Sequence, residues 1–450
     1  MHWKLAWVGV GLLSVLAACA REPAPVKTPP IVFISLDTLR ADMLGLYGYD
    51  TYRVSPFLDS LAGEMVVFEN AIAQSPHTLT SHTTLFTGLP PHEHRADEKH
   101  VLAPEIPTLA ARLTESGYQT QAFADGGFLK AKWGLERGFE GYDEGDRLGL
   151  DSVLPKALAW LEDEAQAPFF LFLHSYDVHA VGWHPFYPSP EPYDGMFSAG
   201  IDSPLNVASR KEFVAAFLER KQRLDATDLR LVRARYAEGI RHVDDALRDF
   251  FERIRSFDWY DEALIVIWSD HGEGLFDHED YSHGEVFDHT IRVPLLVRFP
   301  GGAHAGRRVE SVVESADLAP TILELAGAEP LASARGRSLL QTLERVDEAR
   351  EVFSARTTYD ARRFSLRTLS HHYVWHPQED AHWLFDLRDD PAERRNLVGQ
   401  GLPEEKRLRD RLTAWVVDEH DRKRGQPLRS EEVRLDEATE EGLRALGYIE

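Results

Sequence analysis

The stretch that decides the fold is residues 31–37, IVFISLD, a nearly continuous apolar run that ends in a carboxylate. Such a run is typical of a strand that is buried on both faces. Similar apolar runs recur at residues 119–124, 168–175, 262–270 and 293–300. Segments with helical periodicity lie between them, at residues 106–117, 153–165, 231–257 and 316–328. This alternation predicts an α/β fold with a mostly parallel sheet covered by helices on both faces.

Changes in composition along the chain indicate where domains begin and end. The alternating pattern fills residues 31–330, which we expect to form the main domain. Within it, residues 181–230 are rich in proline and aromatic side chains and poorly periodic, so we expect an insertion over the face that carries the site. Residues 331–450 combine runs typical of antiparallel strands with a charged helical end, which predicts a smaller α+β domain.

The charge of the chain limits its partners. The 450 residues include 74 Asp plus Glu against 50 Lys plus Arg, a formal net charge of -24. A protein this acidic repels phosphate backbones at long range, so we expect no nucleic acid partner. An anionic substrate would need local positive charge from a metal ion or from a cluster of His and Arg side chains.

Cys19 is the only cysteine, so the chain can form no internal disulfide and no cysteine metal site. Residues 1–19 contain one lysine, an apolar run too short to span a bilayer, and small residues before the cysteine, as in a secretory signal. The segment LAAC at residues 16–19 resembles a bacterial lipoprotein signal with a lipidated Cys19, and a simple signal peptide is the alternative. Residues 20–30 are proline-rich, as in an extended tether. We therefore expect a bacterial envelope protein, at the outer membrane or the periplasmic face, held to the membrane through a lipid anchor only.

Polar side chains follow two of the apolar runs directly. Asp37 ends the first run, and Asp270 with His271 ends the run at residues 262–270. Because functional groups of a parallel sheet gather beyond the carboxyl ends of its strands, we expect these three side chains to lie close together. Two carboxylates and one imidazole are suitable ligands for a divalent cation. The alternative is that the sequence SDHGE forms only a capped loop.

The segment QSPHTLTSHTTLFTG, residues 74–88, places a group of hydroxyls and histidines before a predicted helix. One interpretation is a hydroxyl N-cap, in which Thr or Ser accepts hydrogen bonds from the first amides of the helix. The other is that Thr78 offers its hydroxyl to a metal ion as a nucleophile. A metal ion lowers the pKa of an alcohol, and the amides of a helix start favour an anion.

Several longer blocks of the sequence resemble segments of a single known family. They are ISLDTLRADMLGLYGYD (34–50), SPHTLTSHTTLFTG (75–88), IWSDHGEGLFDH (267–278), IRVPLLVRFPG (291–301), LFDLRDDPAERRNL (384–397) and LRALGYIE (443–450). In order and spacing they resemble the sulfatase family of the alkaline phosphatase superfamily. The resemblance implies a doubly wound α/β domain, a small C-terminal antiparallel sheet, one divalent metal ion at the strand ends, and a nucleophile that also ligates the metal. Calcium, magnesium, manganese and zinc are the candidate ions.

The resemblance assigns roles to individual positions. Asp37, Thr78, Asp270 and His271 match the metal ligands, and Thr78 also matches the nucleophile. A second ion, as in two-zinc branches of the superfamily, would involve Asp177.

Three histidines also match positions that act on the substrate in the family. His179 matches the residue that contacts the leaving or transferred group, and His283 matches the one that binds an equatorial oxygen. His82 stands where the family has an arginine that steadies the nucleophile. For His179 and His283 the alternative is a surface loop histidine.

Other charged side chains near these blocks have simpler interpretations. We expect Arg40 and Asp42 to form a structural pair, and His278 and His289 to be solvated loop residues.

Two departures from the family pattern change the expected chemistry. The family motif reads Cys or Ser, any residue, Pro, Ser, Arg, whereas residues 78–82 read TLTSH. Oxidation of a threonine would give a ketone, so the formylglycine of the family cannot form at Thr78. Many sulfatases have two adjacent Asp residues at the first strand end, but here Asp37 is followed by Thr38. Both departures resemble superfamily members that act on phosphate esters through an unmodified threonine.

We therefore expect a metal-dependent hydrolase of sulfate or phosphate esters, with phosphate or phosphonate esters favoured because a sulfo-threonine lacks the aldehyde hydrate that expels sulfate. The substrate is an anionic ester, with glycans and lipids among the candidates. One alternative is a transferase that passes a phospho-headgroup to an envelope lipid or glycan. Another is an inactive binding protein on the same fold.

Overall fold

The computed structural model describes residues 28–145, 149–180, 187–206, 224–356 and 362–426, together with positions 212, 215, 216, 219 and 440. The expected signal (1–19) and most of the tether (20–30) lie outside the described residues, as do parts of the expected insertion and of the charged C-terminal end. Among the described helices, none is both long enough and apolar enough to cross a membrane.

A large sheet built around β1 (Ile31–Leu36) forms the centre of the main domain. β1 pairs in parallel with β5 (Phe169–Ser175) on one side and with β6 (Leu264–Trp268) on the other. The complete spatial order is β11 (Arg308–Glu314), β2 (Val66–Ile72), β10 (Leu295–Arg298), β6, β1, β5, β3 (Gln119–Phe123) and β4 (Gly141–Asp143), and β9 (Arg292–Val293) pairs with β2. Only β9 and β10 run antiparallel to their described neighbours, which confirms a mostly parallel sheet.

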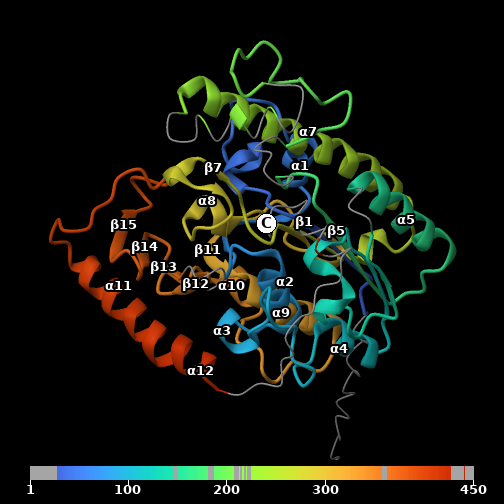
Figure 1. Ribbon diagram of the computed structural model, residues 1–450. Helices are drawn as coiled ribbons and strands as arrows, with labels where there is room; N and C mark the ends of the chain where they lie inside the picture. Colours follow the sequence, from blue (N-terminus) through green and yellow to red (C-terminus); the bar gives the residue numbers. More distant parts are fainter. Residues whose placement is uncertain are drawn as a thin grey trace, which may run out of the picture.

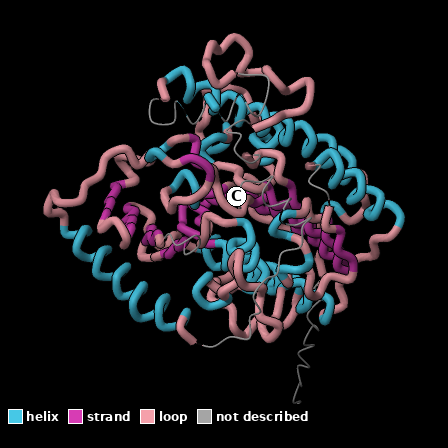
Figure 2. The backbone as a smooth tube through the Cα atoms, viewed as in Figure 1, coloured by secondary structure: helices cyan, strands magenta, loops and turns pink. Residues whose placement is uncertain are grey.

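Helices cover both faces of this sheet, because alternate side chains of the buried strands point to opposite sides. Phe33 packs in one apolar core with α2 (Thr78–Thr87), α4 (Leu109–Glu115) and α9 (Leu318–Ala326). Val32 and Ile34 pack in the other with α1 (Pro56–Leu61), α5 (Leu150–Asp163) and α7 (Ala226–Ile254). The two helical layers lie on either side of the strands in Figure 1, and Figure 2 shows the same arrangement by secondary structure. The fold is therefore doubly wound.

The predicted elements are confirmed, with differences at their ends. α7 begins at Ala226, inside the expected insertion, because Asp225 and Asp228 form a capping box at its start. β2 and β11 were not predicted, because they carry polar residues near the sheet edge, such as the half-buried Glu69 and Asn70 and the exposed Glu310. Their mixed composition hides them from a search for apolar runs.

The C-terminal part contains a four-stranded antiparallel sheet, β12 (Val352–Arg356), β13 (Arg363–Arg367), β14 (His371–His376) and β15 (Ala381–Asp386). α11 (Pro403–Ala414), a π-helical segment (Trp415–Asp421) and the short α12 (Arg422–Arg424) follow it. The strand β12 is tied to the main domain, since Ser354 Oγ donates to Ala73 O at 2.7 Å and Ala355 N donates to Gln74 O at 3.0 Å. The smaller α+β unit is confirmed, and its start near residue 331 stays a prediction.

Candidate active site

The site begins where β1 ends. Asp37 is fully buried, and its Oδ2 lies 3.1 Å from Thr78 Oγ1 and 3.4 Å from His174 Nε2. The next residue, Thr38, has a φ of 56°, a left-handed conformation that is strained for a β-branched side chain. Thr38 is held there because its amide donates to Asp270 Oδ1 at 3.2 Å and its carbonyl accepts from Tyr236 Oη at 2.7 Å. The strained turn aims Asp37 at the neighbouring strand end.

Asp270 and His271 follow β6, which lies beside β1, and both are fully buried. Asp270 Oδ1 accepts from the amides of Thr38 and His271. His271 Nδ1 lies 3.0 Å from Gly272 O, which requires the proton on Nδ1 and leaves the lone pair of Nε2 free to bind a metal. That Nε2 lies 3.4 Å from Asp270 Oδ2 and 3.3 Å from Thr78 Oγ1. The expected convergence of the two strand ends is present.

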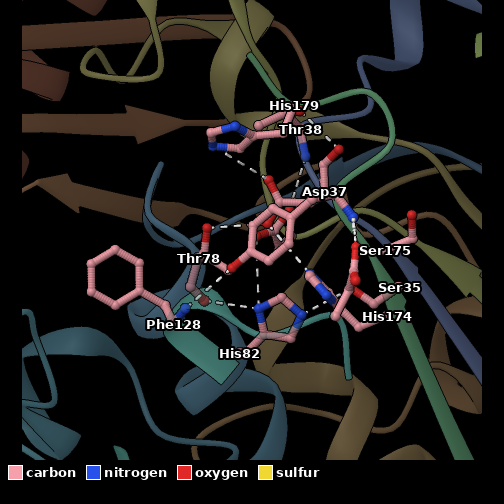
Figure 3. A network of polar contacts seen from close by, with 12 residues as sticks. Ser35, Asp37, Thr38, Thr78, His82, Phe128, His174, Ser175 and His179 are labelled. Atoms are coloured by element: carbon pink, nitrogen blue, oxygen red, sulfur yellow. Dashed lines mark hydrogen bonds and ion pairs between the residues drawn. The ribbon is translucent and has the colours of Figure 1, made fainter. Parts of the chain in front are cut away.

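Thr78 is the first residue of α2, and its hydroxyl faces the two strand ends. The hydroxyl N-cap interpretation is wrong, because the N-cap is His77 and its side chain makes no capping hydrogen bond. The hydroxyls of Thr83 and Thr87 instead donate to carbonyls four residues earlier. As Figure 3 shows, the helix start carries Thr78 to Asp37.

These side chains fit a divalent cation. Ligand atoms of Asp37, Asp270 and His271 lie within 4.8 Å of one another. Asp37 Oδ1 and Asp270 Oδ2 are buried and accept no hydrogen bond from any described residue. A buried carboxylate oxygen without a hydrogen bond is costly, and the ring nitrogens near these atoms, His271 Nε2 at 3.4 Å from Asp270 Oδ2 and His179 Nε2 at 4.0 Å from Asp37 Oδ1, make none to them. A set of two carboxylate oxygens and one imidazole nitrogen is suitable for a divalent cation.

The pKa values of these groups follow from the crowding of buried charges. Burial raises the pKa of Asp37 to about 6, against the opposing effect of His271. Burial and the charge of Asp37 raise the pKa of Asp270. For His271 burial lowers the pKa, but Asp270 and Asp37 outweigh it and the net shift is upward. Without a bound ion, His271 offsets the charge of the two acids, and a cation in the site would take over that role and leave Nε2 unprotonated.

His82 and His174 lie beneath the Thr78 hydroxyl. His82 Nδ1 donates to Thr78 O at 2.8 Å, and its Nε2 therefore accepts from Ser35 Oγ at 2.9 Å. Both nitrogens of His82 are engaged, so the ring fixes the first turn of α2 and does not contact a reacting group. Burial lowers the pKa of His82 to about 3 and that of His174 to about 4, so both are neutral.

His179 and His283 close the site on the other side. His179 Nε2 lies 4.0 Å from Asp37 Oδ1, and the rings of His179 and His283 are 4.9 Å apart. The His283 ring is in turn 4.7 Å from that of His271. Both side chains are buried, so the surface-loop interpretation is wrong. Burial lowers the pKa of both histidines well below its usual value.

Other expectations are tested by the same contacts. Asp177 does not approach the site, because its Oδ2 accepts from Leu150 N at the start of α5 and its Oδ1 faces His242. Arg40 pairs with Asp42 at 2.6 Å, as expected. The solvated-loop interpretation is wrong for His289, which is 8% exposed and lies 3.2 Å from Asp280.

His278 is also less exposed than expected. Its ring stacks on Phe287, with 4.0 Å between the centroids, and is half-buried.

The sequence did not single out two residues of the site. His174 lies in the apolar run of β5, where a lone histidine before the strand end was the available signal. Glu273 follows His271 by two residues, is fully buried, and places Oε1 3.4 Å from His283 Nδ1. Burial raises the pKa of Glu273 to about 7. Glu273 could be noted within the sequence SDHGE, but its contact with His283 could not be predicted from it.

Comparison with known proteins places this geometry in a family. The family model "Sulfatase" matches residues 29–328, and the model "N-sulphoglucosamine sulphohydrolase, C-terminal" matches residues 274–420. The chain is 26% identical over 398 residues to the multifunctional alkaline phosphatase superfamily protein PehA of Trinickia caryophylli, covering 70% of this chain and 76% of that protein. It is 25% identical over 448 residues to an arylsulfatase of Clostridium perfringens, covering 82% and 90%.

Solved structures share the fold. The phosphonate monoester hydrolase of Agrobacterium radiobacter superposes with a TM-score of 0.70 at 22% identity, covering 86% of this chain and 95% of that one. BT1596, a 2-O glycosaminoglycan sulfatase, gives a TM-score of 0.70 at 20% identity, covering 89% and 93%. Since the family model spans well over half of the chain, including the residues that form the strand ends, this protein belongs to the sulfatase family and is an ester hydrolase of that family.

Proposed function

We propose that this protein hydrolyses phosphate or phosphonate esters, with Thr78 as the nucleophile. The observation that carries the proposal is the position of the Thr78 hydroxyl, 3.1 Å from Asp37 Oδ2 and 3.3 Å from His271 Nε2 at the start of a buried helix. An alcohol held between two ligands of a divalent cation is placed to become a nucleophile.

The metal requirement is part of the proposal. Asp37, Asp270 and His271 would hold the cation, with Thr78 Oγ1 beside it. When bound, a divalent cation would lower the pKa of the threonine hydroxyl and offset the negative charge of the reacting group. Asp37 Oδ1 and Asp270 Oδ2, which accept no hydrogen bond from a described residue, support this role.

The proposed reaction has two steps, attack by Thr78 on phosphorus and hydrolysis of the phospho-threonine by water. Thr78 Oγ1 forms a bond to phosphorus while the bond from phosphorus to the leaving oxygen breaks. The hydroxyl proton has an acceptor in Asp37 Oδ2, and the leaving oxygen takes up one proton in return. Water then attacks the phospho-threonine, which restores the hydroxyl and releases the phosphate or phosphonate.

In this proposal His179 and His283 stabilise the negative charge of the substrate. In the free site their imidazoles are neutral, because burial lowers the pKa of each. A bound dianionic or monoanionic ester favours the protonated form, so the two rings can donate hydrogen bonds to the reacting oxygens once the ester arrives. His82 acts indirectly, by holding Thr78 through its carbonyl.

Chemistry favours phosphorus over sulfur at this site. A threonine cannot provide the aldehyde hydrate that releases sulfate in formylglycine enzymes, whereas water resolves a phospho-threonine directly. Proteins similar to this chain include hydrolases of both kinds, an arylsulfatase and phosphonate monoester hydrolases among them. Glycan esters are candidate substrates because a solved structure with a similar fold is a complex with a glucosamine disulfate.

The test is a parallel assay of an aryl sulfate, a phosphate monoester, a phosphodiester and a phosphonate monoester with wild type, Thr78→Ala and Thr78→Ser. We expect phosphorus esters to be turned over faster than the sulfate, Thr78→Ala to lose at least about 1,000-fold of that rate, and Thr78→Ser to retain part of it. Dominant sulfate turnover would overturn the preference for phosphorus. Unchanged turnover in Thr78→Ala would overturn the nucleophile.

We also propose that Cys19 carries the lipid anchor that holds the enzyme in the bacterial envelope. The support is the segment LAAC before a proline-rich stretch. Cell fractionation of Cys19→Ala against wild type tests it, with release of the variant from the membrane as the expected result.

A further inference from the structure

We propose that Arg356 is a specificity-determining residue, which binds a second negatively charged group on the alcohol portion of the substrate. The inference rests on the proposed function and adds to it the chemical class of the ester: one with a carboxylate, sulfate or phosphate beyond the reacting group. Arg356 is the last residue of β12, so the recognition comes from the C-terminal sheet and not from the domain that holds Thr78.

The docking of β12 sets the position of this arginine. Ser354 Oγ donates to Ala73 O and Ala355 N donates to Gln74 O, so the end of the strand is fixed against the segment that leads into α2. Arg356 pairs in register with Arg363 of β13, which fixes the strand from its other edge. The residue after these anchors is therefore held a short distance from the helix start that carries Thr78.

A glycine makes room for the guanidinium on the opposite side. Gly284 directly follows His283, and a Cβ at position 284 would overlap Arg356 Nη1. The guanidinium thus rests against the backbone of the loop that supplies His283. The positive charge of Arg356 is also one of the causes, after burial, that lower the pKa of His77 and His283. Arg356 therefore lies beside the loop of His283, and its charge reaches His77, which precedes Thr78, as well.

Two other basic side chains of the site already have partners within the protein. Both ring nitrogens of His82 are engaged, by Thr78 O and Ser35 Oγ, and His283 Nδ1 lies 3.4 Å from Glu273 Oε1. Arginine keeps its charge at all physiological pH values and binds carboxylate, sulfate or phosphate through a planar fork. In a protein with a net charge of -24, such a group is needed to hold a second anion near the site.

Depth within the site decides which part of the substrate Arg356 meets. Thr78, Asp37 and Asp270 are fully buried, so the reacting group lies at the bottom. Arg356 is partly exposed, as is Gly284 beside it. A partly exposed arginine beside the loop of His283 is therefore placed to meet the portion of the ester that projects from the reacting group.

The test compares two esters that differ by one carboxylate: 4-nitrophenyl phenylphosphonate and its analogue with a carboxylate on the nitrophenyl ring. The quantity measured is the preference ratio, which is kcat/KM for the carboxylated ester divided by kcat/KM for the plain ester. We expect this ratio to exceed one in wild type and to fall about 30-fold in Arg356→Met, as for loss of a charge-assisted pair. Arg356→Lys should recover part of the ratio.

Arg362→Met is the matched control. Arg362 precedes β13 in the same sheet, is 39% exposed and pairs with Asp421, so it carries the same charge without facing the site. We expect its turnover and preference ratio to stay within about twofold of wild type. A ratio that is unchanged in Arg356→Met, or that falls equally in Arg362→Met, overturns the inference, as does a wild type that prefers the plain ester.

A second variant separates contact from folding. Gly284→Ala keeps Arg356 but displaces its guanidinium, so the preference ratio should fall in the same direction while thermal melting confirms the fold. Calorimetric binding of the carboxylated nitrophenol needs no turnover. If wild type hydrolyses neither phosphonate, the proposed function is decided by the phosphate esters of its own assay, and the inference stands only if this phenol binds wild type at least about 10-fold more tightly than Arg356→Met.

Discussion

Two buried clusters of this protein each bring together two carboxylates and one imidazole. The strand-end cluster consists of Asp37, Asp270 and His271, and the interdomain cluster consists of Asp288, His372 and Glu393. In the interdomain cluster Arg367 Nη2 lies 3.2 Å from Asp288 Oδ2, the amide of Asp288 donates to Glu393 Oε2, and His372 Nδ1 donates to Glu393 Oε1. In the strand-end cluster no described lysine or arginine pairs with either acid, and one oxygen of each acid accepts no hydrogen bond from a described residue.

The difference between the two clusters shows how a candidate metal site can be distinguished from a structural contact. Residue types and distances are alike in the two clusters, so neither distinguishes a metal site from a structural contact. What distinguishes them is how the negative charge is balanced. The interdomain cluster joins α8 (Asp288–Ile291) to strands β13 and β14, and an arginine completes it. In the strand-end cluster each acid keeps one buried oxygen without a hydrogen bond from a described residue, and this is why we propose a cation there.

The largest effect is expected from Asp270→Asn. Losing one carboxylate ligand should abolish tight divalent binding and reduce ester turnover by about 10,000-fold, because the charge that activates Thr78 is lost. In the metal-free protein the same change should leave stability equal or higher, since it removes the repulsion between Asp270 and Asp37. Metal analysis, turnover and urea unfolding in chelator measure the three effects. A metal-free variant that is strongly destabilised would contradict this account.

Arg367→Met tests the other cluster with the opposite result. It leaves buried Asp288 without its main partner, which should cost about 3 kcal/mol of unfolding free energy. Metal content per folded molecule should not change, because Arg367 is not part of the strand-end cluster. Arg337→Met, an exposed arginine that pairs with Asp347, is the control and should cost under about 1 kcal/mol. Loss of metal in Arg367→Met would show that the two clusters are not independent.

Much of the strand-end cluster could be predicted from the sequence, because Asp37, Asp270 and His271 each end a continuous apolar run. The position of a strand end determines where such a side chain lies, whatever the rest of the fold does. Thr78 was predicted at a helix start with two interpretations of its hydroxyl, and the hydroxyl lies beside the strand-end residues, as in the second, and does not cap the helix.

The interdomain cluster could not be predicted in the same way. Asp288, His372 and Glu393 come from a short helix, an antiparallel strand and a turn, and no periodic pattern connects them. His289 looked solvated for the same reason, because its burial depends on packing between segments distant in sequence. Arg356 belongs to this class too: its strand was predicted, but the docking of that strand beside Gln74 was not.

The effect of added metal on folding stability should distinguish the two clusters. A divalent ion that binds only the folded state stabilises it by about 2.7 kcal/mol at 100 times its Kd. We expect this gain in wild type, none in Asp270→Asn, and the full gain in Arg367→Met on its lower baseline. Thermal melting with and without magnesium, calcium, manganese or zinc measures it and ranks the candidate ions. A gain of the same size in Asp270→Asn would place the ion elsewhere.

The smallest effect concerns pH, and the two clusters should respond with opposite signs. Burial raises the folded pKa of Asp37 to about 6, above its ordinary value of 3.8, so its contribution to metal-free stability is fully present below pH 4 and is lost as pH rises through 6. This contribution is about 2 kcal/mol between pH 4 and pH 6. For Asp288 burial raises the pKa, but Arg367 and His372 outweigh it and the net shift is downward, so its contribution is present above the ordinary value and lost only in stronger acid. The measurement is urea unfolding in chelator. The difference in unfolding free energy between wild type and Asp37→Asn should change from pH 4 to pH 6. The corresponding difference between wild type and Asp288→Asn should stay nearly constant from pH 5 to pH 7. Equal pH dependence in both comparisons would mean that the acids of the strand-end cluster are already balanced by the protein, which would remove the main argument for a cation there.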